Sequence, residues 1–131
     1  MRNPAFLAAA VFIATGLVAA PAPAQTGPDK PIRLIVPSPP GGGTDGVSRG
    51  LAGKMGELAR WQLFVENRPG SGGNLGMDAA AKAAPDGYTL VMGESANLAI
   101  NPYLYKKLPF DPARDVAPVA LVGTVPLVLV V

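Results

Sequence analysis

The sequence predicts an α/β fold in which parallel strands alternate with helices. Three observations support this prediction: the apolar run 32–36 leads through a glycine-rich stretch into an amphipathic stripe, the same order recurs over 62–84, and a third apolar run begins at Tyr88. Each parallel connection needs a crossover, usually a helix, to return the chain to the start of the next strand. The alternation therefore indicates a parallel-type sheet flanked by helices.

Composition limits the classes of function that the chain can have. Its 131 residues are 49% hydrophobic and 15% charged, which fits one domain with or without a tail and excludes a disordered polyelectrolyte. The net charge of +2 comes from scattered residues, so no nucleic-acid surface is expected. The chain has no Cys and no His, which removes thiol nucleophiles and the most common general acid–base side chain. We therefore expect no enzymatic activity, no metal site and no cofactor.

Residues 1–24 have the pattern of a secretory signal peptide. Arg2 precedes the apolar stretch 6–20, and the small residues of the sequence PAPAQ follow it. A membrane-spanning helix needs ~20 apolar residues, whereas Thr15 and Gly16 interrupt this run. We expect cleavage after Ala24 and export of the remaining chain, with an uncleaved anchor as the alternative.

The first predicted unit is a strand followed by a helix. The run Ile32–Val36 is broken only by Arg33, which is typical of a strand buried on both faces. The helix is predicted from four apolar residues at helical spacing: Val47, Leu51, Met55 and Leu58. Four glycines lie away from that stripe and each disfavour a helix by ~1 kcal/mol relative to Ala: Gly46, Gly50, Gly53 and Gly56. The helix should therefore be weak by itself.

The later elements repeat this order. A second strand is predicted over 62–66, a second helix over 75–84 and a third strand over 88–92. A further helix is expected over 95–105, interrupted by Pro102, and β-branched runs over 120–123 and 127–131 favour more strands. Nothing after the last run covers its apolar residues, so we expect the sequence to be the amino-terminal part of a longer protein.

Two glycine-rich loops are the predicted binding elements. PSPPGGGTDG at 37–46 and ENRPGSGGNLG at 66–76 each lie between the carboxyl end of a strand and the start of a helix. Parallel strands bring both loops to one edge of the sheet, where ligands bind at the point at which strand order reverses. Unpaired backbone N–H groups at a helix start favour an anion. The two loops therefore predict a small anion between them, and tight turns without a ligand are the alternative.

Two charged residues in these loops, Asp45 and Arg68, have two interpretations each. Thr44 or Asp45 can cap the helix that follows, and Asp45 can instead pair with a ligand ammonium. Arg68 can bind a carboxylate through two hydrogen bonds, or it can cover the edge of the sheet.

A dinucleotide-binding enzyme is the competing hypothesis. Gly41, Gly43 and Gly46 satisfy the G-x-G-x-x-G fingerprint, and Glu66 follows at the distance of a ribose-binding acid. The fingerprint needs its first glycine in the turn that leaves the strand, whereas four residues, 37–40, intervene here. Acyl transfer by a serine is disfavoured because the chain has no His to activate it.

Five segments of the chain together carry a family resemblance. They are KPIRLIVPSPPGGGTD, ENRPGSGGNLG, APDGYTLVMG, LAINPYLYKKLPFDP and DVAPVALVGTVPLVLVV. In this order and spacing they resemble the tripartite tricarboxylate transporter substrate-binding proteins, also called the Bug family. The resemblance implies a periplasmic-binding-protein-like lobe over 25–123, truncated before a second lobe, with 124–131 starting the crossover strand.

The same resemblance implies a function and a set of contacts. It implies a periplasmic, monomeric receptor that captures a small organic acid and delivers it to the permease subunits of a membrane transporter. The ligand-binding residues carried over from the family are Ser38, Pro39, Gly42, Gly43, Thr44, Asp45, Ser71, Gly72, Gly73, Asn74, Ser95 and Asn97. Two features depart from the family pattern: Gly46 and Gly50 in the first helix, and Glu94, where a small hydroxyl residue is usual.

Overall fold

The computed structural model describes residues 27–125 and 129–130, so the predicted signal peptide lies outside the described residues. The elements in chain order are β1 (Ile32–Val36), α1 (Gly43–Ala59), β2 (Leu63–Asn67), η2 (Ser71–Gly73), α2 (Asn74–Ala81), β3 (Thr89–Val91), η3 (Ala96–Ile100) and α3 (Asn101–Leu104). The two η elements are single turns, one a 3₁₀ helix and the other a π-helix.

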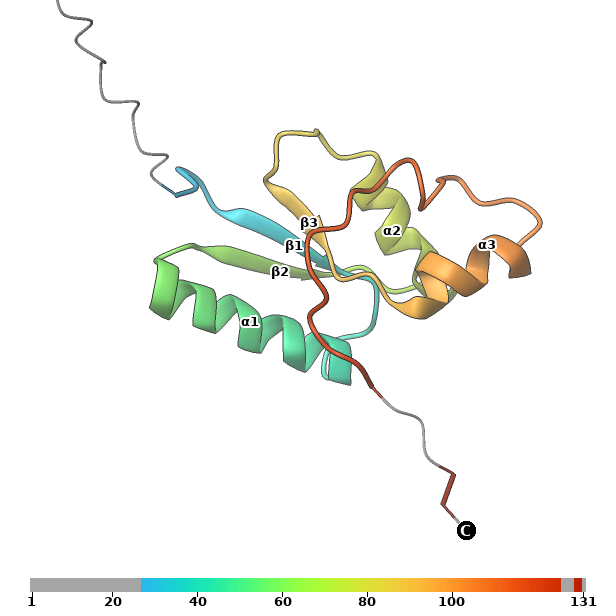
Figure 1. Ribbon diagram of the computed structural model, residues 1–131, viewed down its shortest axis with the longest axis horizontal. Helices are drawn as coiled ribbons and strands as arrows, with labels where there is room; N and C mark the ends of the chain where they lie inside the picture. The colour runs from blue at the N-terminus through green and yellow to red at the C-terminus, as the bar shows by residue number, and fades with distance from the viewer. Residues whose placement is uncertain (1–26, 126–128, 131) are drawn as a thin grey trace, which may run out of the picture.

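The three strands form one parallel sheet in the order β2-β1-β3. Val36 pairs with Asn67 of β2, and Ile35 pairs with Val91 of β3, so the carboxyl ends of all three strands meet at one edge. Figure 1 shows α1 and α2 on opposite sides of this sheet. The predicted α/β class with a parallel sheet flanked by helices is confirmed, and strand order reverses at β1.

The core is centred on β1. Four of its five residues are buried and Arg33 is half-buried, which confirms a strand covered on both faces. Met77 of α2 and Phe110 complete the buried apolar set among the described residues. Full burial of a side chain of this size contributes ~1.5–3 kcal/mol, so β1 contributes more burial energy than either neighbouring strand.

The predicted apolar stripe of α1 is confirmed at two of its four positions. Val47 is 52% exposed and Leu58 is 83% exposed, whereas Asp45 and Ser48 are buried. The buried or half-buried positions of α1 are 44, 45, 48, 51, 52 and 55, so Leu51 and Met55 of the predicted stripe do face inward, while the first inward positions are polar. The first inward residues are polar because hydrogen bonds hold them there. Asp45 is held at the sheet edge by hydrogen bonds, and the Ser48 hydroxyl donates to the Thr44 carbonyl at 2.7 Å.

The glycines of α1 have no packing role in the described structure. A Cβ atom added at Gly46, Gly50 or Gly53 would meet no atom within 4 Å, and at Gly56 it would meet only the Trp61 carbonyl oxygen at 3.7 Å. Nothing in the described structure explains why these four positions are glycine.

The helix expected over 95–105 is found as η3 followed directly by α3, and the change from π-helical to α-helical geometry falls next to Pro102. One other expectation is corrected. Residues 120–125 form no strand, because in the described part of the chain no further strand pairs with them. The run 127–131 falls mostly outside the described residues. The ends of the second strand and of the second helix differ from the predicted ends by one to three residues.

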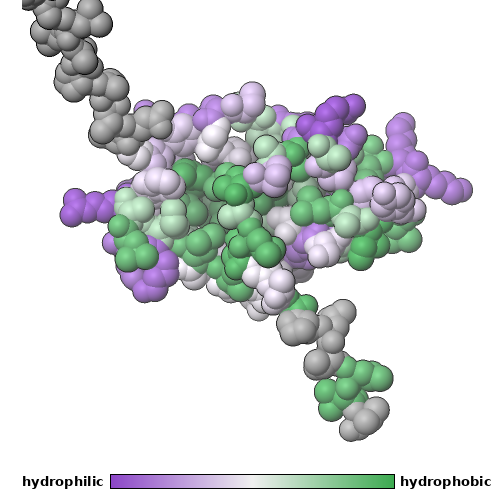
Figure 2. Space-filling view, viewed as in Figure 1, coloured by the Kyte–Doolittle hydropathy of each residue, from purple (hydrophilic) through white to green (hydrophobic). Residues whose placement is uncertain are grey.

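Large apolar side chains are exposed on several elements, and Figure 2 shows apolar residues across the face turned toward the viewer. They include Phe64 of β2 and Leu104 of α3. Within the described ranges, none of the helices combines the length and apolar composition that crossing a bilayer requires.

Candidate functional site

The candidate site lies at the carboxyl edge of the sheet, where segments after β1, β2 and β3 come together. The side-chain amide of Asn67, at the end of β2, donates to the Ser38 carbonyl at 3.1 Å. On the other side of β1, Thr44 donates its hydroxyl proton to Glu94, which follows β3, at 2.7 Å. The loop after β1 is therefore joined to both neighbouring loops.

The first glycine loop presents unpaired backbone donors. Helix α1 begins at Gly43 with Gly42 as its N-cap, and its first helical bond runs from the Gly46 N–H to the Gly42 carbonyl. Among the described residues, the N–H groups of Gly42, Gly43 and Thr44 have no hydrogen-bond acceptor. Both glycines are exposed, as is Pro39. This loop therefore presents consecutive N–H donors at the positive end of a 17-residue helix.

Asp45 has a structural role. Its carboxylate accepts hydrogen bonds from the Gly41 N–H at 2.8 Å, from Arg49 Nε at 3.0 Å and from Asn67 Nδ2 at 2.9 Å. These contacts, the one from Arg49 above all, lower the pKa of Asp45 to about 2. Asp45 is 4% exposed, so its oxygens are directed into the protein. These contacts favour a structural role over an ion pair with a ligand, but the predicted capping is not found, because the N-cap residue is Gly42 and no side chain makes a cap hydrogen bond there.

The second glycine loop also presents unpaired donors. Among the described residues, the N–H groups of Gly70, Ser71 and Gly72 have no acceptor. Ser71 and Gly72 are exposed and lie in the left-handed region, with φ of 51° and 64°. For a serine this conformation is strained, and such strain is concentrated at binding sites.

Two glycines allow the second loop to approach the first. Gly73 has φ of 86°, and a Cβ atom there would lie 2.8 Å from Asn97 Nδ2 and 3.3 Å from the Pro37 carbonyl oxygen. A Cβ atom at Gly76 would lie 2.7 Å from Cβ of Pro37. Any larger residue at either position would push the two loops apart. The approach predicted from the sequence thus depends on these two residues.

The segment after β3 closes the site through asparagines. Asn97, in η3, is 1% exposed and accepts a hydrogen bond from the Glu94 N–H at 2.9 Å, while the predicted contact Ser95 is exposed. Asn101 donates to the Gly72 carbonyl at 3.0 Å and to Asn74 Oδ1 at 2.8 Å. Single π-helical turns such as η3 occur frequently at functional sites.

Two of the predicted residues carry buried polar atoms without a partner. In the described part of the chain, Ser38 Oγ and Asn74 Nδ2 have no hydrogen bond, and Asn74 is 4% exposed. Leaving such a group unpaired costs ~1–3 kcal/mol, so a bound water or ligand at either atom would be stabilised.

Sequence reasoning missed Asn67 and Asn101, which join the loops. Asn67 lies inside the segment 66–76 that was predicted as the second loop, and that position was the available signal. Asn101 had no such signal, because its partners Gly72 and Asn74 lie 29 and 27 residues earlier in the chain.

The features that suggested other chemistry are occupied within the protein. Glu66, the candidate ribose-binding acid, pairs with Arg33 Nε at 2.6 Å and with Arg68 Nε at 2.5 Å. The same contact commits Arg68 to the edge of the sheet, which was the second of its two interpretations. The hydrogen bond from Arg68 is the main cause that lowers the pKa of Glu66. Within the described ranges, no three His, Cys, Asp or Glu side chains are grouped to hold a metal ion.

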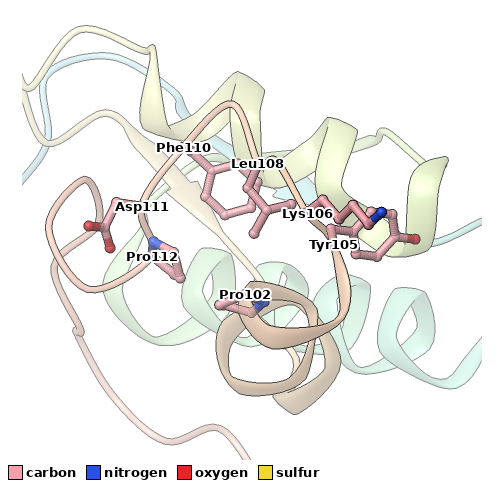
Figure 3. Close-up of a pocket in the computed structure, with 7 residues that line it drawn as sticks. All are labelled: Pro102, Tyr105, Lys106, Leu108, Phe110, Asp111 and Pro112. Carbon is pink, nitrogen blue, oxygen red and sulfur yellow. The ribbon is translucent and has the colours of Figure 1, made fainter.

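Two surface hollows lie away from the glycine loops. The larger, of about 330 Å³, is shown in Figure 3 and is lined by residues from α3 and the segment that follows it: Pro102, Tyr105, Lys106, Leu108, Phe110, Asp111 and Pro112. The smaller, of about 190 Å³, lies at the opposite edge of the sheet near Lys30 and Arg60. Neither contains a glycine-loop residue. Gly42, Gly43, Ser71 and Gly72 are exposed, so the candidate site is an open edge of the described chain.

Comparison with known proteins gives consistent matches. Residues 47–131 match the family of the tripartite tricarboxylate transporter family receptor. Protein BugT of Bordetella pertussis is 48% identical over 92% of this chain and 37% of its own length, and a protein from the tcbD-tcbE intergenic region of a Pseudomonas strain is 43% identical over 79% of this chain and 31% of its own length. The chain therefore spans about a third of the length of these curated relatives.

Solved structures agree with the sequence matches. MatC from Rhodopseudomonas palustris with bound malate is 36% identical, with a TM-score of 0.68 over 72% of this chain and 32% of that chain. A second R. palustris protein, with adipate, is 34% identical, with a TM-score of 0.63 over 66% of this chain and 29% of that chain.

Proposed function

Because the chain belongs to the tripartite tricarboxylate transporter receptor family, we propose that it forms the first lobe of a periplasmic receptor that captures a small carboxylate. Delivery of that carboxylate to the permease subunits of a membrane transporter is part of the same proposal. Two similar solved structures contain malate and adipate, which supports this class of ligand.

The observation that carries the proposal is the set of unpaired N–H groups in the two glycine loops. Gly42, Gly43 and Thr44 contribute donors from the first loop, and Ser71 and Gly72 contribute donors from the second. A hydrogen bond to a charged group contributes ~1.5–3 kcal/mol, and micromolar affinity requires ~8 kcal/mol. Four or five such bonds are therefore sufficient without a basic side chain in contact with the ligand.

Binding of the ligand is proposed to occur as two lobes close on it. The candidate site is open in the described chain, so a second lobe would supply the other wall and exclude water. A permease can then distinguish a loaded from an empty receptor, because the ligand stabilises the closed arrangement. This role requires binding and release without any chemical change in the ligand.

Titration calorimetry tests the proposal on the full-length protein that carries this chain. The ligands are mono-, di- and tricarboxylates, aromatic acids and NAD. We expect at least one carboxylate to bind at micromolar or lower concentration and NAD to give no heat. Tight NAD binding without a response to any carboxylate would reverse the assignment in favour of a dinucleotide-binding enzyme.

A matched pair of substitutions locates the site. A side chain at Gly43 would meet no atom within 4 Å, so Gly43→Val should fold while blocking the approach of a ligand to the backbone. We expect an affinity loss of at least tenfold. Gly50→Val places the same side chain in open space two turns along α1 and should leave affinity unchanged. Equal affinity of both variants would contradict the loop model.

A further inference from the structure

Glu94 is placed at the same edge of the sheet as the two glycine loops. Its position is set by β3, whose pairing with β1 continues through a hydrogen bond from the Met92 N–H to the Ile35 carbonyl at 2.9 Å. Its backbone N–H donates to Asn97 Oδ1, and its carboxylate accepts a hydrogen bond from Thr44. Glu94 is half-buried, and these two hydrogen bonds hold its backbone and its side chain in one arrangement.

The charge of this carboxylate is not neutralised in the described part of the chain. Six acidic side chains form ion pairs there, and Glu94 is not among them. Its hydrogen-bond donor, the Thr44 hydroxyl, is neutral. Asp45 is different, because Arg49 compensates its charge. Glu94 is therefore the carboxylate at the carboxyl edge that has no basic partner.

The contact with Thr44 brings this charge to the first turn of α1. Thr44 is the second residue of the helix, next to the N–H groups of Gly42 and Gly43 that have no acceptor. The edge thus presents donors for an anion and, beside them, a fixed negative charge. A ligand that carries only negative charge gains the first contact and is repelled by the second.

A zwitterion satisfies both features. We propose that Glu94 makes the site selective for a carboxylate that also carries a protonated amine, as an α-amino acid does. The ligand carboxylate binds the N–H groups of the glycine loops, and its ammonium group binds the Glu94 carboxylate. This inference rests on the proposed function and names the ligand class more narrowly than that function does.

Calorimetry with matched ligand pairs tests this assignment on the full-length protein. The pairs share a carbon skeleton and differ only in the amine: succinate and aspartate, glutarate and glutamate, propionate and alanine, and 3-phenylpropionate and phenylalanine. In any pair that binds, we expect the amino acid to bind at least tenfold more tightly. Tighter or equal binding of the amine-free acid would overturn the assignment.

The variant Glu94→Gln removes the charge and keeps an oxygen that can accept the Thr44 hydrogen bond. We expect it to bring the two members of a pair within about threefold of each other. Glu57→Gln, at an exposed position near the other end of α1, makes the same change in net charge and should preserve the preference. An unchanged preference in Glu94→Gln would assign the selectivity to another residue.

The outcomes separate this inference from the proposed function. If amine-free acids bind at the glycine loops as tightly as amino acids, the assignment of Glu94 fails and the receptor function stands. If no carboxylate of either panel binds, both fail. Thermal unfolding of each variant, compared with the unsubstituted protein, shows whether lost affinity reflects lost structure.

Discussion

The side-chain amide of Asn67 donates a hydrogen bond to Asp45 Oδ1 at 2.9 Å, and this contact joins the end of β2 to the first turn of α1. The same amide group also donates to the Ser38 carbonyl, and its oxygen accepts from Arg49 at 2.9 Å. One asparagine therefore fixes the first glycine loop against the strand that precedes the second. The spacing of the two loops depends on it.

Substitution of Asn67 by Ala should destabilise the protein by about 1–3 kcal/mol, because it leaves partly buried partners without their donor. Chemical denaturation measures this loss as a lower midpoint with an unchanged slope. Gln62→Ala, at an exposed position just before β2, is the control and should change stability little. A loss of similar size in both variants would show that the loop contact is not its cause.

Stability should fall in acid partly because of Asp45. Its pKa is lowered to about 2 in the folded protein from the ordinary value of 3.8, so its contribution is present above pH 4. That contribution is lost as the pH falls from about 4 to about 2. Denaturation midpoints measured between pH 2 and pH 6 should show a gap between the unsubstituted protein and Asp45→Asn that narrows in acid. A constant gap across this range would contradict the assignment.

Alanine at Gly73 should destabilise the protein by more than 1 kcal/mol. The residue has φ of 86°, which costs an L-residue roughly 1–2 kcal/mol, and the added Cβ would lie 2.8 Å from Asn97 Nδ2. Thermal unfolding measures the loss, and carboxylate affinity should fall with it because the second loop moves. Unchanged unfolding together with unchanged affinity would show that the close approach of the loops is not required.

Alanine at Gly53 should have the opposite effect. The site is open, its backbone is helical, and Ala favours a helix interior by about 0.5–1 kcal/mol relative to Gly. Thermal unfolding should show a higher midpoint, and ligand affinity should be unchanged because Gly53 lies more than two turns from the glycine loop. A lower midpoint would indicate a contact that lies outside the described residues.

Much of the fold follows from local patterns. The bounds of β1 match the apolar run that predicted them, because a strand buried on both faces needs apolar side chains at successive positions. The common edge of both glycine loops follows in turn, since parallel strands end together. The inward face of α1 could not be predicted in the same way. Its first two buried residues, Asp45 and Ser48, are polar and owe their burial to hydrogen bonds that no apolar pattern records.

The candidate site was also predictable from the sequence only in part. The glycine loops and their donors were visible in the sequence, because three consecutive glycines before a helix leave N–H groups that the helix does not use. The contacts that hold the loops together were not visible, because Asn101 and Gly72 are 29 residues apart and meet only through the sheet. The two interpretations of Asp45 and of Arg68 also required the structure, since each depended on which neighbour came within hydrogen-bond distance.

The sequence by itself determined the succession of strands and helices along the chain, the positions of the glycine loops and the family resemblance. These features depend on residues that are close along the chain. Tertiary structure decided which neutral groups hold the acids of the candidate site: the Asn67 amide donates to Asp45, and the Thr44 hydroxyl donates to Glu94. These two contacts join residues that are 22 and 50 positions apart and belong to different segments of the fold, and spacing along a sequence does not encode such pairs.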